Sequence, residues 1–203
     1  MKSIFLIIVF MISFLTPVNA GLEVPGEADP SLAKVYFSIE DKPMVAEKIF
    51  TLEGVYLEVR DAQTQQVFWK SDIIGEFEKH FIINERKRSM VAIDMAGNDI
   101  PELLVSTSYS PNNSALYVFS YQSSDNTFKP ISFVSQDLSR DFLVSDIPQE
   151  NGLDLVINED KTFRSLGYIY PDTPAQDRMP GYYYYKFDQD SFQLVRSEPV
   201  PVE

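Results

Sequence analysis

From Lys34 onward, apolar and aromatic residues come in short runs that are separated by turn-forming residues. Runs of Val, Ile, Phe and Tyr with such breaks are typical of β-strands joined by turns. No long stretch carries the apolar spacing of a helix, and the nearest approach, from Phe68 to Phe81, is broken at Gly75. The pattern therefore predicts an all-β, antiparallel fold in a single domain over residues 34–203.

The first twenty residues follow a different pattern. Lys2 precedes an apolar run from Ile4 to Leu15, and Pro17 follows this run closely. A positive start, a short apolar core and a small-residue site, here Val18 to Ala20, are the features of a cleaved secretory signal peptide. The run is too short for a membrane anchor, which needs about 20 apolar residues. We therefore expect residues 1–20 to be a signal peptide.

The segment after the signal peptide contains prolines, glycines and several acids, so residues 21–33 are predicted to form a leader that joins the cleavage site to the fold. No second long apolar stretch occurs in the sequence, and no membrane span is expected after cleavage. The expected location is the periplasm or the exterior of the cell.

Composition narrows the classes of function. The chain has no cysteine, which excludes disulfides, a thiol nucleophile and thiolate metal sites. Its net charge of -13 disfavours nucleic acid as a partner, because phosphate binding needs a basic face. The acidity favours basic protein partners or divalent cations, although a solvated acidic surface needs no partner. His80 is the only histidine, so a histidine zinc cluster is excluded and a Ser-His-Asp arrangement has little support.

Two segments of the chain resemble each other at a distance of 52 residues. Residues 93–105 and 145–157 each contain an Asp, a polar loop with glycine, an acid eight positions later and then aliphatic residues. Three stretches also read as a strand, a polar turn and a return strand, which is the pattern of a hairpin. These stretches are residues 55–69, 116–128 and 182–192. Together they indicate three imperfect units of about 50 to 60 residues, a range typical of repeat folds.

The loop-then-strand pattern resembles the FG-GAP or VCBS repeat, whose consensus is Asp-x-Asp-Gly-Asp-Gly-x-x-Asp-Leu followed by aliphatic residues. This resemblance implies four-stranded blades of a β-propeller. Three units are fewer than an ordinary closed propeller contains, so the expected fold is propeller-like and either open or distorted.

The resemblance also implies calcium ligands in both loops, because carboxylates at alternating loop positions converge on one hard cation. The implied ligands are Asp94, Asn98 and Glu102 in the first loop, and Asp146, Glu150 and Asp154 in the second. The third consensus position is Ala96 or Pro148 here, so an oxygen ligand is lost in each loop. The alternative is that each first Asp only accepts backbone hydrogen bonds in its turn. The expected cofactor is therefore none, or weakly bound calcium.

Tyrosines mark a candidate binding surface. Tyr182 to Tyr185 form one run, and in a strand alternate members face opposite sides of the sheet. Tyr182 and Tyr184, joined by Tyr168 and Tyr170, would make an aromatic patch suited to a protein or a sugar, unless all of them only pack within the sheet.

The Pro-rich loop 171–181 interrupts the third unit and contains Asp172, Asp177 and Arg178. Such a long loop in a compact domain is typical of a recognition device. A second charged feature is the basic cluster Arg86–Arg88, which is expected to form a turn and to meet an acidic partner or only solvent.

Size, signal peptide and degenerate loops resemble bacterial periplasmic immunity proteins and inhibitors that block secreted cell-wall hydrolases. This resemblance implies a non-enzymatic protein that inserts a loop such as 171–181 into a basic peptidoglycan hydrolase or toxin, with the acidic surface steering the two proteins together. Two alternatives stay open from the sequence: a hydrolase that uses a pair of carboxylates, and a calcium-dependent adhesive or structural module.

Overall fold

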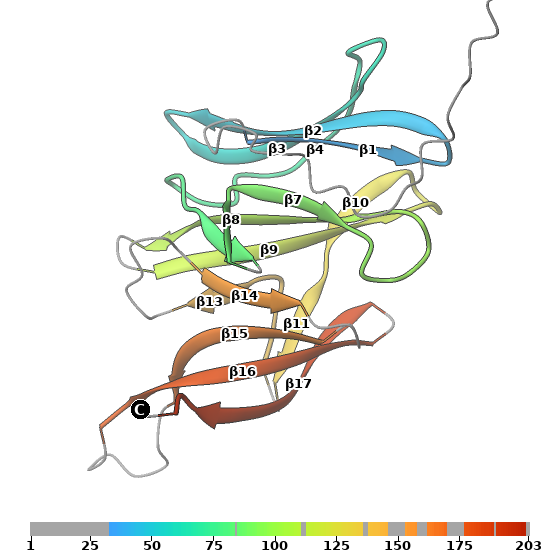
Figure 1. Ribbon diagram of the computed structural model, residues 1–203. Coiled ribbons are helices and arrows are strands. Elements are labelled where there is room, and N and C mark those ends of the chain that lie inside the picture. Colours follow the sequence, from blue (N-terminus) through green and yellow to red (C-terminus); the bar gives the residue numbers. More distant parts are fainter. Residues whose placement is uncertain are drawn as a thin grey trace, which may run out of the picture.

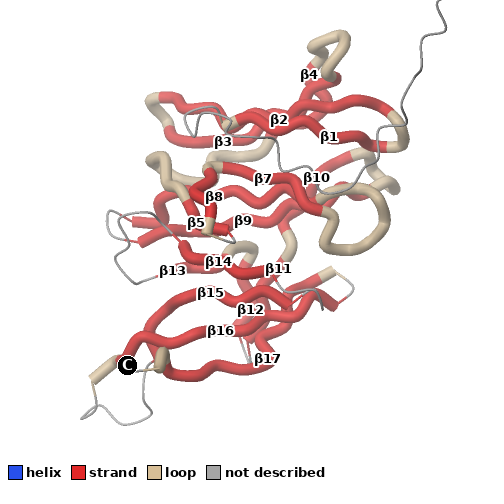
Figure 2. Tube along the Cα trace, viewed as in Figure 1, coloured by secondary structure: helices blue, strands red, loops and turns tan. Residues whose placement is uncertain are grey.

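The structure is a computed structural model that describes residues 33–83, 85–110, 113–135, 138–145, 153–157, 162–169, 177–188 and 190–201. Throughout these residues the regular secondary structure is β, which confirms the all-β prediction (Figures 1 and 2). No helix with the length and apolar character of a membrane span occurs in them. The predicted signal peptide and nearly all of the predicted leader lie outside the described residues.

Three four-stranded antiparallel meanders make up most of the fold. The first consists of β1 (Lys34–Ile39), β2 (Lys42–Thr51), β3 (Gly54–Asp61) and β4 (Val67–Lys70). The second consists of β7 (Met90–Ile93), β8 (Glu102–Ser110), β9 (Asn113–Gln122) and β10 (Thr127–Pro130). The third consists of β14 (Leu153–Ile157), β15 (Thr162–Ile169), β16 (Met179–Asp188) and β17 (Ser191–Pro199).

All three predicted hairpins are present, and each is formed by the last two strands of a meander. They are β3–β4, β9–β10 and β16–β17. The alternation of apolar and polar residues fixes their register, because a slip of one residue would turn the core side chains to solvent. Phe128 thus opposes Tyr121 in the second hairpin, and Phe192 opposes Phe187 in the third.

Five further strands connect or extend the meanders. They are β5 (Phe81–Ile83), β6 (Arg86–Arg88), β11 (Ser132–Ser135), β12 (Leu138–Arg140) and β13 (Leu143–Ser145). Two of them pair in parallel, β5 with β14 and β11 with β17. The prediction of an antiparallel fold is thus correct for the meanders and wrong for these two pairs, because both strands belong to crossings from one meander to the next.

The basic cluster Arg86–Arg88 is a strand and not the predicted turn. It pairs with β5, so that Arg88 opposes Phe81. The turn comes one residue earlier, where Glu85 takes a φ of 67°. The sequence prediction failed here because consecutive charged residues carry little strand propensity, and pairing with the buried β5 overrides it.

The meanders stack in three layers, with the second between the other two (Figure 1). Strand β8 shows this position, because its first seven residues are all buried. Leu103 and Val105 pack in a core shared with the first meander, whereas Leu104 packs in a core shared with the third. The described residues form no closed barrel or propeller ring. The first and third meanders each keep one outer face.

Both ends of the stack carry exposed carboxylates, and exposed apolar residues gather at one of them. The second strand of each meander ends, and the third begins, at the same end of the molecule, on the left of Figure 1. The connection from β15 to β16 lies at this end. The predicted loop 171–181 is wrong at its C-terminal bound, because Met179 to Gly181 already belong to β16 and pair with β15, and residues 171–176 lie outside the described residues. The opposite end holds turns that are rich in carboxylates. The β1–β2 turn contains Glu40 and Asp41, the β7–β8 turn contains Asp94 and Asp99, and the β9–β10 turn contains Asp125.

Candidate protein-binding surfaces

Exposed apolar side chains gather where β2 ends and β8 ends. Leu52 is fully exposed in the β2–β3 turn, and Phe77 is 60% exposed in the segment that crosses from the first meander toward the third. Three further exposed apolar residues lie beside them. We call the five together the apolar end: Phe50, Leu52, Ile73, Phe77 and Tyr109.

Backbone contacts hold the apolar end together. The Val55 amide donates to the Gly75 carbonyl at 2.7 Å, and the Ile74 amide donates to the Val55 carbonyl at 2.8 Å. The Ser108 amide donates to the Phe77 carbonyl at 3.0 Å, and the Phe77 amide donates to Ser108 Oγ at 2.8 Å. The crossing segment is thus fixed to both β3 and β8, which holds Ile73 and Phe77 in place.

Two glycines permit this close packing. A Cβ at Gly75 would lie 2.5 Å from Thr107 Oγ1 and 2.7 Å from the Ser108 carbonyl oxygen. A Cβ at Gly54 would lie 2.5 Å from the Gly75 carbonyl oxygen, and Gly54 has a φ of 133° that other residues rarely adopt. The glycine that broke the helical pattern in the sequence therefore marks the point where the crossing segment touches the second meander.

The tyrosine run alternates across β16 as predicted. Tyr183 and Tyr185 pack in the core between the second and third meanders. Burial raises the pKa of Tyr185 to about 12. Tyr182 and Tyr184 point to the other side of the sheet, because successive side chains of a strand face opposite sides. They share that side with Arg164, which opposes Tyr184 in the register.

Arginines stack on the outward tyrosines. The guanidinium carbon of Arg164 lies 4.2 Å from the ring centre of Tyr182, and that of Arg196 lies 3.9 Å from the ring centre of Tyr184. A third such pair joins Arg178 to Tyr168 at 4.2 Å. We call this surface the Arg–Tyr face. Its members are Arg164, Tyr168, Arg178, Tyr182, Tyr184, Lys186, Arg196 and Glu198.

Strand alternation also places Asp188 on this face, but the carboxylate that contacts a tyrosine and an arginine there is that of Glu198. It accepts a hydrogen bond from the Tyr184 hydroxyl at 2.6 Å and lies 3.6 Å from the Arg196 guanidinium. The hydrogen bond from Tyr184 to Glu198 raises the pKa of the tyrosine. The face carries more cations than anions, whereas the whole chain is strongly acidic.

Most of the predicted partner-binding residues fall on this face or next to it. Tyr168, Tyr182 and Tyr184 lie on it together, and Arg178 contacts Tyr168. Asp177 is exposed beside them. Tyr170 and Asp172 lie outside the described residues.

The predicted calcium loop of the second meander connects β7 to β8. The Asp94 carboxylate accepts hydrogen bonds from the amides of Gly97, Asn98 and Asp99 at 2.6 to 3.1 Å. Asn98 Oδ1 accepts from the Ile100 amide at 3.0 Å. Asp94 thus takes the turn-stabilising role that the sequence left open as the alternative to calcium, and Asn98 stabilises the same turn.

Glu102 is buried at the start of β8. Its Oε2 accepts hydrogen bonds from the amides of Met95 and Ala96, at 2.7 and 3.3 Å. Burial raises the pKa of this carboxyl, and the two amide bonds oppose the rise. No group of three or more His, Asp or Glu side chains with metal-site geometry occurs in the part of the chain that the structure describes.

The second predicted calcium loop has a different topology. It joins β13, which pairs with β9 in the second sheet, to β14 in the third. The first loop instead joins two strands of one meander. Asp146 and Glu150 lie outside the described residues, and Asp154 is placed only as a member of β14. Calcium binding at either loop stays a prediction.

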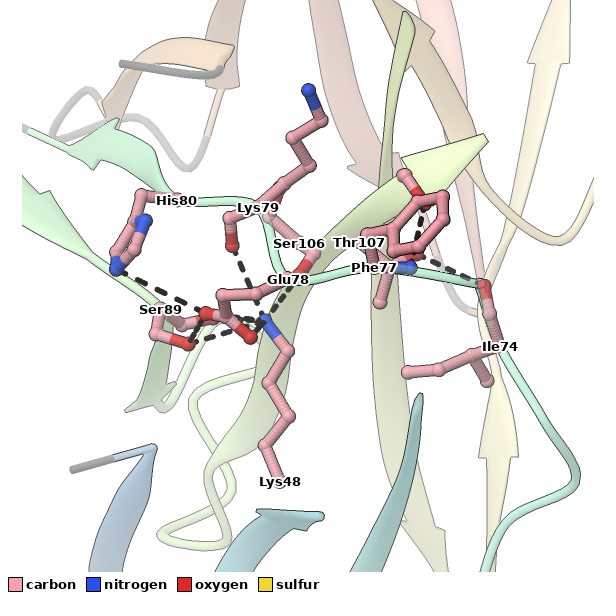
Figure 3. A network of polar contacts seen from close by, with 10 residues as sticks. Lys48, Ile74, Phe77, Glu78, Lys79, His80, Ser89, Ser106 and Thr107 are labelled. Atoms are coloured by element: carbon pink, nitrogen blue, oxygen red, sulfur yellow. Dashed lines mark hydrogen bonds and ion pairs between the residues drawn. The ribbon is translucent and has the colours of Figure 1, made fainter. Parts of the chain in front are cut away.

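A buried lysine forms a polar cluster that was not predicted (Figure 3). The Lys48 ammonium lies 3.0 and 3.1 Å from the two oxygens of Glu78 and 3.1 Å from Ser89 Oγ. It also donates to the backbone carbonyls of Lys79, at 3.2 Å, and Ser106. The Ser89 hydroxyl donates to Glu78. The members of the cluster lie on β2, in the crossing segment, just before β7 and on β8, so the cluster ties the first meander to the second.

The burial of this cluster decides between a catalytic and a structural role. Burial lowers the pKa of Lys48 to about 8, while the nearby Glu78 carboxylate opposes this shift. A lysine of low pKa beside a serine hydroxyl resembles a nucleophile with its base. However, the Lys48 side chain is fully buried and Ser89 is only 5% exposed, so a substrate cannot reach them. The geometry supports an interior ion pair that joins two sheets.

One feature of the sequence could have predicted that Lys48 is buried. Lys48 continues the alternation of Met44 and Ala46 on the buried face of β2, where a charged residue must have a partner. The partner itself could not be found, because Glu78 is 30 residues away.

No family model matches the chain, and no curated protein or solved structure shows significant similarity to it.

Proposed function

We propose that this protein is an exported, non-enzymatic binding protein that contacts another protein through its apolar end. The observation that carries the proposal is the gathering of five exposed apolar side chains at one end of the stack. Single exposed apolar residues are common, but a group of them is typical of an interaction site. Export is inferred from the signal-peptide pattern of residues 1–20.

The backbone contacts of this end favour binding over local disorder. Ile73 and Phe77 are held by hydrogen bonds to β3 and β8. Apolar residues that are fixed before binding lose less conformational entropy when a partner covers them. Aromatic residues such as Phe77 and Tyr109 supply large contact areas of the kind that dominates binding energy.

We further propose that the three meanders are blades of an open, propeller-like fold, and that the partner is a secreted cell-wall hydrolase. Four-stranded meanders stacked face to face are the units that the resemblance to FG-GAP repeats implies. The connection between β15 and β16 lies at the same end of the stack as the apolar residues. A loop there and the apolar end would together cover the active-site cleft of one hydrolase.

The experiment is an inhibition assay with purified mature protein, residues 21–203, against a panel of secreted muramidases, amidases and endopeptidases acting on purified peptidoglycan. We expect the wild-type protein to slow one class at near-stoichiometric amounts. L52D/F77D should lose this inhibition because charges at the apolar end oppose burial. The control variant is Y36D, since Tyr36 is 72% exposed on the outer face of the first meander, away from this end.

Two outcomes contradict the proposal. If L52D/F77D, shown to be folded by its circular dichroism and its urea midpoint, inhibits as well as the wild type, the apolar end is not the binding surface. If no enzyme of the panel is inhibited, the hydrolase-inhibitor function is wrong.

A further inference from the structure

The Arg–Tyr face of the third meander has features of a second binding surface that the apolar end does not provide. Three of the arginines of an acidic chain meet there, and each stacks on a different tyrosine. From these contacts we propose that the face binds an acidic segment of a partner polypeptide, one that presents carboxylates next to apolar or aromatic side chains.

Available guanidinium groups are the first argument. Within the described residues, neither Arg164 nor Arg178 has a carboxylate partner. A guanidinium that stacks on a ring uses its flat face, and its N–H groups remain directed sideways. These N–H groups match a carboxylate, which accepts two parallel hydrogen bonds.

The spacing of the arginines is the second argument. Arg164 and Arg196 oppose Tyr184 from the two neighbouring strands. Adjacent strands lie about 4.8 Å apart, so the backbones of the two arginines are about 10 Å apart across the sheet. Carboxylates two residues apart on an extended segment are separated by about 7 Å. Long, stacked arginine side chains can adjust to this difference, so one short acidic segment can meet both.

The tyrosines distinguish a polypeptide from a highly charged polymer. Tyr182 and Tyr184 lie between the arginines, and they offer ring surface to apolar or aromatic side chains. A polyanion such as polyphosphate gains little from rings and is repelled by the net charge of -13. A protein segment with a few carboxylates between aromatic residues gains from both kinds of group.

This inference is independent of the apolar end. Arg164, Arg196 and their tyrosines lie on the outer face of the third meander, whereas the apolar residues come from the first two meanders and the crossing segment. L52D/F77D should therefore leave acidic-segment binding unchanged. Failure of one proposal does not decide the other.

The test is fluorescence anisotropy at low salt with the mature protein and a fluorescein-labelled ten-residue peptide of alternating Glu and Tyr. The comparison peptide has Gln in place of each Glu. We expect saturable binding of the acidic peptide by the wild type. The dissociation constant should be at least tenfold higher for the Gln peptide and for R164Q/R196Q. R86Q/R88Q is the matched control, because it removes the same charge from β6, and it should bind like the wild type.

Three results would overturn the inference. The first is that the wild type fails to bind the acidic peptide. The second is that R164Q/R196Q binds it as tightly as the wild type while its urea midpoint is unchanged. In the third, polyphosphate binds the wild type more tightly than the acidic peptide and displaces it, so the face recognises a polyanion and not a polypeptide. A dissociation constant that rises with salt is expected in each supporting case, because the contact is ionic.

Discussion

Glu78 is the carboxylate that contacts the buried Lys48 ammonium, with both of its oxygens within 3.1 Å. Removing one partner of a buried ion pair costs about 3 to 5 kcal/mol, because the other charge is left buried without compensation. Glu78 is partly exposed, and Lys48 keeps three backbone carbonyl partners and the Ser89 hydroxyl, so we expect the lower value. Glu78→Gln should reduce the free energy of unfolding by about 3 kcal/mol at pH 7.

The cost should depend on pH in a defined direction. The pKa of Lys48 is about 8 in the folded protein and 10.5 in the reference state. Between these values the unfolded chain binds more protons than the folded one, so stability rises with pH from about 8 to 10.5. The full difference corresponds to roughly 3 kcal/mol. Without the Glu78 charge the folded pKa of Lys48 falls below 8, so the penalty of Glu78→Gln is largest where Lys48 is protonated in both folded proteins. It shrinks as the pH rises toward 8 and stays constant above that, because Lys48 is then neutral in both.

The assay is urea unfolding followed by the fluorescence of the single tryptophan, from mildly acidic pH up to pH 10.5. Glu47→Gln is the matched control, because Glu47 precedes Lys48 on β2 and forms exposed ion pairs with Lys34 and Arg60. Such pairs contribute at most about 1 kcal/mol. The reasoning is refuted if the two variants lose the same stability, or if the penalty of Glu78→Gln does not fall as the pH rises toward 8.

Two further changes test the sheet faces and the β7–β8 loop. Tyr185→Ala should cost about 3 to 5 kcal/mol, because the ring is buried among aromatic side chains, and Tyr182→Ala only about 1 kcal/mol, because it points outward; equal losses in urea unfolding would contradict the observed alternation. Asp94→Ala should cost about 1 to 2 kcal/mol, because three amides lose their acceptor, and this cost should be the same with and without millimolar calcium. A calcium-dependent rise in the urea midpoint of the wild type alone would show that Asp94 holds a cation.

Local patterns in the sequence were sufficient for the hairpins and for the faces of β16. Their partners are close in the chain, and alternation in a strand decides which side each tyrosine takes. The same reasoning offered Asp94 as a turn-stabilising residue, because the amides that donate to its carboxylate are at most five residues away in the chain.

Features that depend on how the sheets stack could not be predicted. The five residues of the apolar end are spread from Phe50 to Tyr109, and only the contacts of the crossing segment bring them together. The parallel pairing of β5 with β14 joins residues more than 70 positions apart. The Lys48 cluster likewise depends on packing between two sheets, which a single sequence does not specify.

The most direct test of the central proposal, that the apolar end is the partner surface, is site-specific photocrosslinking in envelope extracts. The photoreactive residue benzoylphenylalanine would replace Leu52 in one variant and Tyr36 in a control, both of which are highly exposed. The proposal predicts one discrete crosslinked protein from position 52 that is absent from position 36 and competed away by unlabelled wild type but not by L52D/F77D. Equal crosslinking from both positions, or none from position 52, would contradict it.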